Sequence, residues 1–109
     1  MRSADASYQG WSGWIIRVEG EIPLVFDPAP GSALSDDEAV ILVTHGHPEH
    51  FQGALAHLRR TNRARVAVIA SHSVCAYLKR ATRRVDDSFL PVSPGHELEV
   101  CSWKVRPFE

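Results

Sequence analysis

Two continuous apolar runs, each followed by a helix-like pattern, most strongly constrain the fold of this chain. The first run spans Ala39 to Thr44 (AVILVT), and the second spans Arg65 to Ala70 (RVAVIA). Continuous β-branched runs are typical of strands that are buried on both faces, as in parallel sheets covered by helices. Apolar residues recur at helical spacing after each run. The sequence therefore predicts an α/β fold, a mixed sheet with two helices on at least one face.

The two predicted helices have recognisable ends. Pro48 suits the first helical position, which predicts a helix over about 48–60. Ser71 or Ser73 is expected to cap the second helix. Its apolar face would carry Val74, Tyr77, Leu78 and Ala81.

Shorter strands are expected on either side of these units. Residues 1–7 are predicted to be a frayed N-terminal segment. The turn signal Glu19-Gly20-Glu21 predicts a hairpin. We expect all 109 residues to form one domain over 1–109, without internal repeats or a linker. The further strands are expected over Trp11–Val18, Ile22–Phe26 and Phe89–Val92, with a last strand pair that turns near Ser102.

Composition and charge exclude several classes of protein. A net charge of -1 at pH 7 excludes a nucleic-acid binder that relies on bulk positive charge. No apolar run approaches the roughly 20 residues that span a bilayer, and the N-terminus lacks the apolar stretch of a secretory signal. The two cysteines, Cys75 and Cys101, are expected to be buried small side chains rather than a disulfide framework. We therefore expect a cytoplasmic protein with neither membrane nor nucleic-acid partners.

The segment directly after the first apolar run carries the chemistry. It reads His45-Gly46-His47-Pro48-Glu49-His50, so three of the six histidines fall within six positions. His45 and His47 are two apart at a strand end, which lets both rings leave from one face and converge on one ion. Imidazole and carboxylate ligands suit zinc, iron or manganese. A single histidine is more often a surface or core residue, but this density at a strand–helix corner predicts a metal site.

The stretch THGHPEH resembles the H-x-H-x-D-H signature of the metallo-β-lactamase-fold hydrolases. The preceding Phe26-Asp27-Pro28 and the later VAVIAS and VSPGHELEV are also similar to that family. The resemblance implies the N-terminal half of an αβ/βα sandwich. It also implies that His45 and His47 bind one metal ion.

The same resemblance assigns Glu49 and His50 to a second ion. It implies one or two ions, with Zn²⁺ expected and iron or manganese as alternatives. The family's substrates are small molecules, and a hydroxide held by the metals attacks an ester, lactone, thioester or phosphodiester. The catalytic role falls to Glu49, which would orient that hydroxide and accept its proton.

Two features of the chain depart from the family pattern. Glu49 stands where the family usually has Asp, and His57, His72 and His96 do not match the positions of the remaining ligands. We therefore expect the later ligands to come from a second half, supplied by a longer chain or a partner. The alternative hypothesis is a non-catalytic remnant or interaction module. Such a module would associate through its exposed apolar sheet face, as a homodimer for instance.

Residues near the motif have two interpretations each. Asp27, at the end of a strand, is either a hydrogen-bond partner of a ligand histidine or its loop, or a turn-forming residue before proline. Trp11 and Trp14 belong either to the core or to the floor of a substrate cleft. The basic residues from Arg59 to Arg84 are interpreted as solvated helix surface, with a phosphate-bearing substrate as the alternative.

Overall fold

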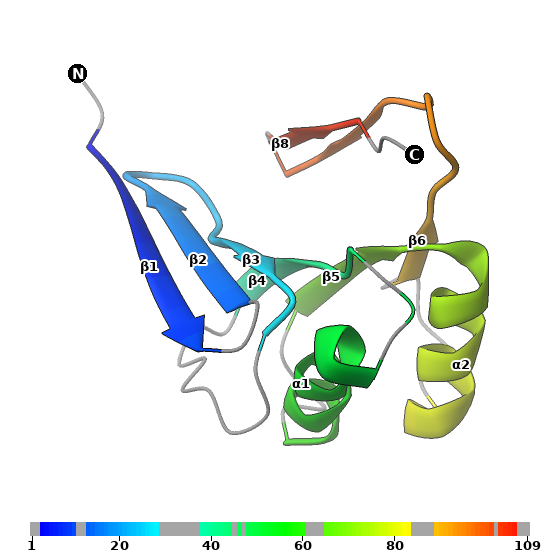
Figure 1. Cartoon of the computed structure of the whole chain (residues 1–109). Coiled ribbons are helices and arrows are strands. Elements are labelled where there is room, and N and C mark those ends of the chain that lie inside the picture. Colours follow the sequence, from blue (N-terminus) through cyan, green and yellow to red (C-terminus); the bar gives the residue numbers. More distant parts are fainter. Residues whose placement is uncertain are drawn as a thin grey trace.

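A computed structural model of the chain describes residues 3–10, 13–28, 38–44, 46, 48–60, 65–83, 89–101 and 103–106. Its helices are α1 (Pro48–Arg60) and α2 (His72–Thr82). Its strands are β1 (Ala4–Gly10), β2 (Gly13–Val18), β3 (Leu24–Phe26), β4 (Glu38–Leu42), β5 (Arg65–Ala70), β6 (Phe89–Pro91), β7 (Leu98–Val100) and β8 (Trp103–Val105). Figure 1 shows the arrangement of these elements.

Strands β1 to β6 form one six-stranded mixed sheet in sequential order. The first two pairings, β1 with β2 and β2 with β3, are antiparallel. The next three pairings, from β3 to β6, are parallel. Helices α1 and α2 provide the two crossovers on either side of β5. The predicted α/β class, with a mixed sheet and two helices, is therefore confirmed.

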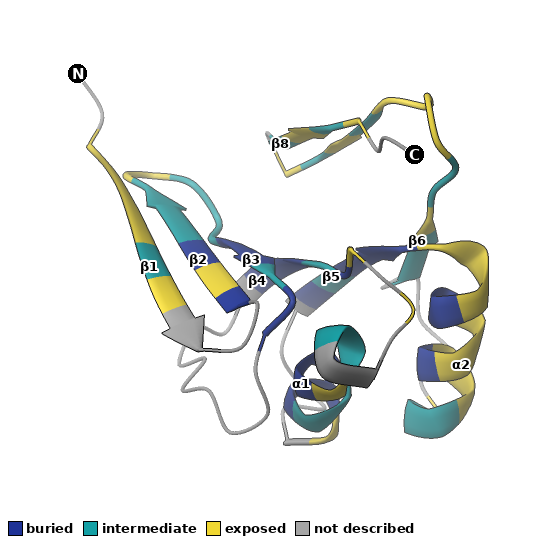
Figure 2. Ribbon diagram, in the orientation of Figure 1, coloured by how far each residue is buried: buried dark blue, intermediate teal, exposed yellow. Residues whose placement is uncertain are grey.

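One face of the sheet packs against both helices. The central strands contribute Ile41 and Val68, which are completely buried, and the helices contribute Leu58 and Leu78. Figure 2 shows the buried positions along the central strands and on the inner sides of the helices. The two apolar runs are continuous because both faces of the sheet are covered. Alternate residues of each run face this cluster, and the residues between them face a second cluster on the other side.

The opposite face of the sheet packs against the hairpin of β7 and β8. Leu24, Val40 and Ile69 are buried on this face, with hairpin side chains packed against them. The indole Nε1 of Trp103 donates a hydrogen bond to the carbonyl of Ile22 at 2.7 Å, which ties the hairpin to the start of β3. The apolar sheet face that the sequence suggested would be exposed is thus covered in part by the hairpin (Figure 1).

The ends of the helices follow from local chemistry. Helix α1 begins at Pro48 and ends at Arg60, as the sequence predicted. The side chain of Ser71 accepts a hydrogen bond from the backbone N of Val74 at 3.3 Å and caps α2. Arg83 ends that helix in the left-handed conformation, with φ of 56°. Within the described ranges, neither helix is long and apolar enough to cross a bilayer.

The N-terminal segment differs from the sequence-based expectation. Residues 1–7 were expected to be frayed, but Ala4–Gly10 form β1, paired with β2 from Ala4↔Val18 to Tyr8↔Trp14. The expectation was wrong because small and polar residues give a weak strand signal of their own. The aromatic and β-branched residues of β2 provide the pairing surface that β1 uses.

The two cysteines lie in different environments. Cys75 is buried in α2, and its thiol donates a hydrogen bond to the carbonyl of Ala70 at 3.7 Å. Cys101 was expected to be buried in a strand, but it is exposed in the turn between β7 and β8, with φ of 50°. That expectation was wrong because the turn of a two-strand hairpin leaves the side chain at its tip in solvent.

We expect a thiol-specific alkylating reagent to modify Cys101 quickly and Cys75 slowly in the folded protein. Burial raises the pKa of the Cys75 thiol, so its thiolate fraction is smaller at any given pH, and the reagent reaches it only when α2 opens. The difference in rate should be about 100-fold or more. Mass spectrometry of timed samples measures both rates, and equal rates at both cysteines would contradict the observed burial.

Candidate metal centre

The candidate site lies where the carboxyl ends of β3 and β4 meet the first turn of α1. Asp27 directly follows β3, Thr44 comes two residues after β4, and His50 is the third residue of α1. Parallel strands place their carboxyl ends at one edge of a sheet, and the helices that follow begin at that edge. The βα connection after β4 therefore brings Thr44 and His50 to Asp27.

Asp27 is the centre of this arrangement. Asp27 is only 3% exposed, and its Oδ1 accepts a hydrogen bond from the backbone N of Thr44 at 2.7 Å. Its Oδ2 accepts a second hydrogen bond from the hydroxyl of Thr44 at 2.5 Å. The same Oδ2 lies 3.0 Å from Nδ1 of His50. One buried carboxylate thus holds both the residue before His45 and the histidine that ends the motif.

The backbone of Asp27 is unusual for a residue with a side chain. Its φ is 41°, in the left-handed region, which Asp tolerates better than most residues. Its backbone N donates to the carbonyl of Leu42 at 2.9 Å, so the conformation is held by β4. The carboxylate bonds to residues 17 and 23 positions along the chain. These long-range contacts favour the interpretation of Asp27 as a positioning residue over that of a local turn former.

His50 is oriented by this contact. Because a carboxylate only accepts hydrogen bonds, Nδ1 of His50 is the donor to Asp27, and Nε2 is the ring nitrogen with which His50 would bind a metal. The carboxylate–histidine–metal arrangement is the usual way in which proteins fix the tautomer and ring angle of a ligand histidine. His50 is half-buried in the described structure, with 15% of its side chain exposed. This histidine is therefore oriented in the way that zinc-ligand histidines usually are.

The remaining motif residues lie partly or wholly outside the described residues. His45 and His47 are outside them, and Glu49 is described only as backbone within α1. Gly46 between the two histidines is exposed, and a Cβ built on it would lie 3.8 Å from Cγ2 of Val74 in α2. Gly46 therefore lies beside the first turn of α2.

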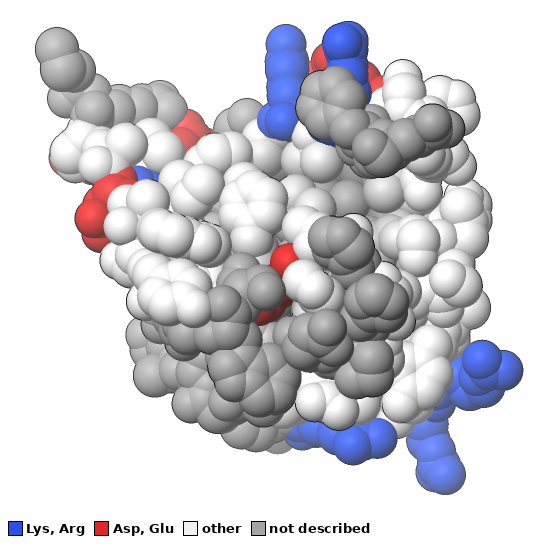
Figure 3. All heavy atoms as spheres, in the orientation of Figure 1, with Lys and Arg blue, Asp and Glu red and all other residues white. Residues whose placement is uncertain are grey.

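The other histidines and the basic residues lie elsewhere. His57 is completely buried in α1, and His72 is exposed at the start of α2. Both helices run antiparallel to the strands and away from the strand ends that carry Asp27. Their last turns therefore lie at the opposite end of the strands. Figure 3 shows Lys and Arg gathered at the lower end of α2 and around the β7–β8 hairpin. Among the side chains that the structure describes, the exposed basic residues at the helix ends are Arg59, Lys79, Arg80 and Arg83.

The position of these basic residues bears on the choice of substrate. They are remote from the Asp27 edge, so they do not provide a phosphate-binding wall for the candidate site. Their exposure agrees with the interpretation of this run as solvated helix surface. The last turn of α2 is also where cations interact favourably with the helix dipole.

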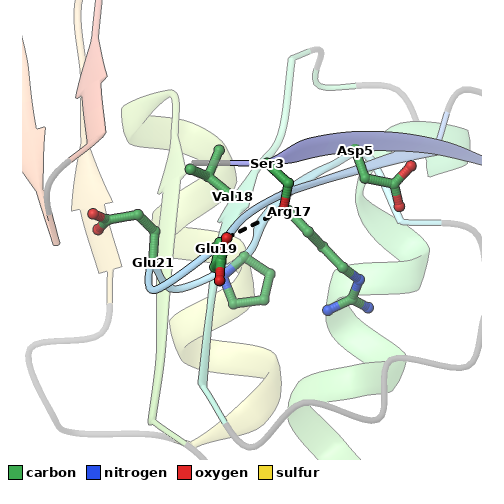
Figure 4. A pocket seen from close by; sticks show the side chains of 7 residues that line it. Ser3, Asp5, Arg17, Val18, Glu19 and Glu21 are labelled. Carbon is green, nitrogen blue, oxygen red and sulfur yellow. Dashed lines mark hydrogen bonds between the residues drawn. The ribbon is translucent and has the colours of Figure 1, made fainter. Parts of the chain in front are cut away.

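A groove of about 470 Å³ lies away from the candidate site. It lies at the opposite end of the strands, next to the start of β3. Within it, the hydroxyl of Ser3 donates a hydrogen bond to Oε2 of Glu19 at 3.4 Å (Figure 4). None of the described residues that line the groove belongs to the motif. It is lined by Ser3, Asp5, Arg17, Val18, Glu19, Glu21 and Pro23.

Comparison with models of known protein families found no family that matches the chain, and comparison with curated proteins found no significant match. Among the residues that the structure describes, no three His, Cys, Asp or Glu side chains come together as a metal-binding group. Three of the four predicted ligand side chains lie outside that set. The metal site therefore stays a prediction, and the contacts of Asp27 are its described part.

Proposed function

We propose that this chain carries the first metal ligands of a metal-dependent hydrolase of the metallo-β-lactamase type. The observation that carries the proposal is the buried Asp27 carboxylate, which binds both Thr44 and His50. A purely structural carboxylate needs only to anchor the end of β4, which the two Thr44 bonds already do. The additional bond to Nδ1 of His50 is the one that prepares a histidine to bind a metal.

The proposed ligands are His45 and His47 for one ion, and Glu49 and His50 for a second. We propose Zn²⁺ as the metal, with iron or manganese as alternatives, because imidazole and carboxylate donors suit all three. When bound, zinc supplies a water molecule whose pKa is lowered to about 7 and polarises the oxygen of a scissile carbonyl or phosphoryl group. An ester, lactone or phosphodiester is the substrate class that such chemistry serves.

The residues of the chain have separate tasks in this proposal. Asp27 holds the ring of His50 and keeps its Nδ1 protonated, while Thr44 fixes the backbone from which His45 departs. Glu49, in the first turn of α1, accepts a proton from the attacking water. Further ligands would be required to complete the site, and the fully buried His57 is not placed to be one of them.

The decisive experiment is measurement of zinc bound per chain, by elemental analysis and by titration calorimetry. We expect the double variant His45→Ala/His47→Ala to lose at least about 100-fold in zinc affinity, since two ligands are removed at once. The matched control is His72→Ala/His96→Ala, which also removes two imidazoles, both exposed and outside the motif. The control should bind zinc as the unaltered chain does.

Hydrolysis of model esters, lactones and phosphodiesters should follow the zinc content of these variants. Zinc affinity that His45→Ala/His47→Ala leaves unaltered, or that both double variants lower equally, would show that binding does not depend on the motif and would overturn the proposal. Zinc binding that depends on His45 and His47 but gives no hydrolysis would support the metal site and favour the alternative of a non-catalytic module.

A further inference from the structure

The last turns of α1 and α2 carry exposed cations without acidic neighbours along the chain. Residues 50–85 contain eight Lys or Arg and no Asp or Glu. Four of these basic side chains are described, and all four are exposed and form no ion pair within the described structure. We call them the helix-end cations (Figure 3), and they are Arg59, Lys79, Arg80 and Arg83.

The exposed cations of the β7–β8 hairpin are different, because each has a carboxylate as its partner. Nη2 of Arg106 lies 3.3 Å from Oε2 of Glu97. Lys104 is the cross-strand partner of Glu99 in the β7–β8 ladder, where opposite charges stabilise the pairing. The charge of the hairpin is therefore balanced locally, and that of the helix ends is not.

The fold itself does not explain this excess of positive charge. The helix dipole favours Lys79 and Arg80 in the last turn of α2, but it does not exclude acidic residues from the preceding turns. Solvated helix surfaces usually gain from carboxylates placed three or four residues from a cation. Here Lys79 and Arg83 are four residues apart and repel each other. An anionic partner is therefore the better explanation of the excess.

We propose that the helix-end cations bind the phosphate backbone of a nucleic-acid duplex without reading its sequence. Such binding depends on the cations at the contact, which displace counterions from the duplex, and not on the net charge of the whole protein. Three of the four cations are arginines, whose planar guanidinium group forms paired hydrogen bonds to phosphate oxygens. The contact lies at the opposite end of the strands from Asp27, so it is separate from the proposed metal site.

The described side chains favour a duplex over other anionic partners. Single-strand binding adds exposed aromatic rings on which bases stack, and protein or membrane contacts add apolar anchors. Among the described residues, Tyr77 is the one exposed large hydrophobic residue on the helices. Its ring packs against Phe51 in the first half of α1, away from the last turns. A duplex backbone requires only cations at the contact.

The first test is fluorescence polarisation with a labelled DNA duplex of about 20 base pairs, over a range of salt concentrations. We expect a Kd of about 1–100 μM near physiological salt, and a slope of log K against log[salt] near about −3.6 for four contacts. Lys79→Ala/Arg80→Ala should reduce that slope by about 1.8 and raise the Kd at least about tenfold. The matched control is Lys104→Ala/Arg106→Ala, which changes the net charge equally and should leave both values nearly unaltered.

The second test uses the unaltered chain, which has only two lysines, Lys79 and Lys104. Both are exposed, so mass spectrometry of the acetylated protein measures the reactivity of each. An excess of the duplex should slow acetylation of Lys79 at least about threefold and leave Lys104 as reactive as before.

Several outcomes would overturn the proposal. The first is the absence of duplex binding below about 1 mM protein at physiological salt. Equal weakening by the two double variants, or equal protection of both lysines, would show a diffuse attraction instead of a site. Tighter binding to a single strand of the same length, or to vesicles that contain phosphatidylserine, would assign the helix ends to another partner. Both tests need neither metal nor hydrolysis, so their outcome is independent of the proposed hydrolase function.

Discussion

The variant Asp27→Ala is expected to lower the free energy of unfolding by about 2–4 kcal/mol, because a buried carboxylate that accepts several hydrogen bonds is lost. Its removal leaves the backbone N–H of Thr44 without its acceptor at the end of β4. It also releases Nδ1 of His50. If His50 is a metal ligand, the loss of its orienting partner should weaken zinc binding by about 10–100-fold.

The two effects of Asp27→Ala can be measured separately. Urea denaturation without metal gives the stability, and calorimetry on the folded variant gives the zinc affinity. Glu99→Ala is the control, because it removes an exposed carboxylate from β7. A stability loss with unchanged zinc affinity would leave Asp27 as an anchor for Thr44 alone, and His50 would then not be a ligand that depends on it.

The central part of the fold could be predicted from the sequence because its signals are local. The runs at β4 and β5 are apolar at every position since both sheet faces are covered, and this property is visible in the sequence. The ends of α1 and the cap of α2 follow from Pro48 and Ser71 alone. Such features depend on neighbouring residues and not on distant contacts.

Other parts depend on distant contacts and could not be predicted. β1 becomes a strand through pairing with β2. The last strand pair itself was predicted, with a turn near Ser102, but Cys101 was placed in a strand and lies in the turn. Tyr77 was placed on the apolar face of α2 but is 42% exposed. It lies at the margin of that face, where its ring packs against Phe51 of α1 at 5.3 Å between centroids.

The candidate site could likewise be predicted only where its signals are local. The sequence places Asp27 at the end of a strand and offers both a turn and a contact with the motif as its role. The choice between them needed the parallel register of β3 and β4, which brings Asp27 alongside the residues that follow β4. The metal ligands His45, His47 and Glu49 stay predictions, since their side chains lie outside the described residues.

Leu78→Ala tests whether stability and zinc binding are separable in this fold. Leu78 is completely buried between α2 and the sheet, so its truncation should cost about 2–5 kcal/mol. The neighbouring Tyr77→Ala, at a 42% exposed position, should cost only about 1 kcal/mol, mainly from its contact with Phe51.

Leu78 lies in the second half of α2, away from the edge of the sheet that carries Asp27. We therefore expect Leu78→Ala to destabilise the chain as much as Asp27→Ala does while its folded form binds zinc unchanged. Denaturation and calorimetry on both variants make the comparison, with both proteins kept below their unfolding transitions. If Leu78→Ala weakened zinc binding as strongly as Asp27→Ala, the loss in the Asp27 variant would reflect general loosening of the fold, and the bond to His50 would lose its special role.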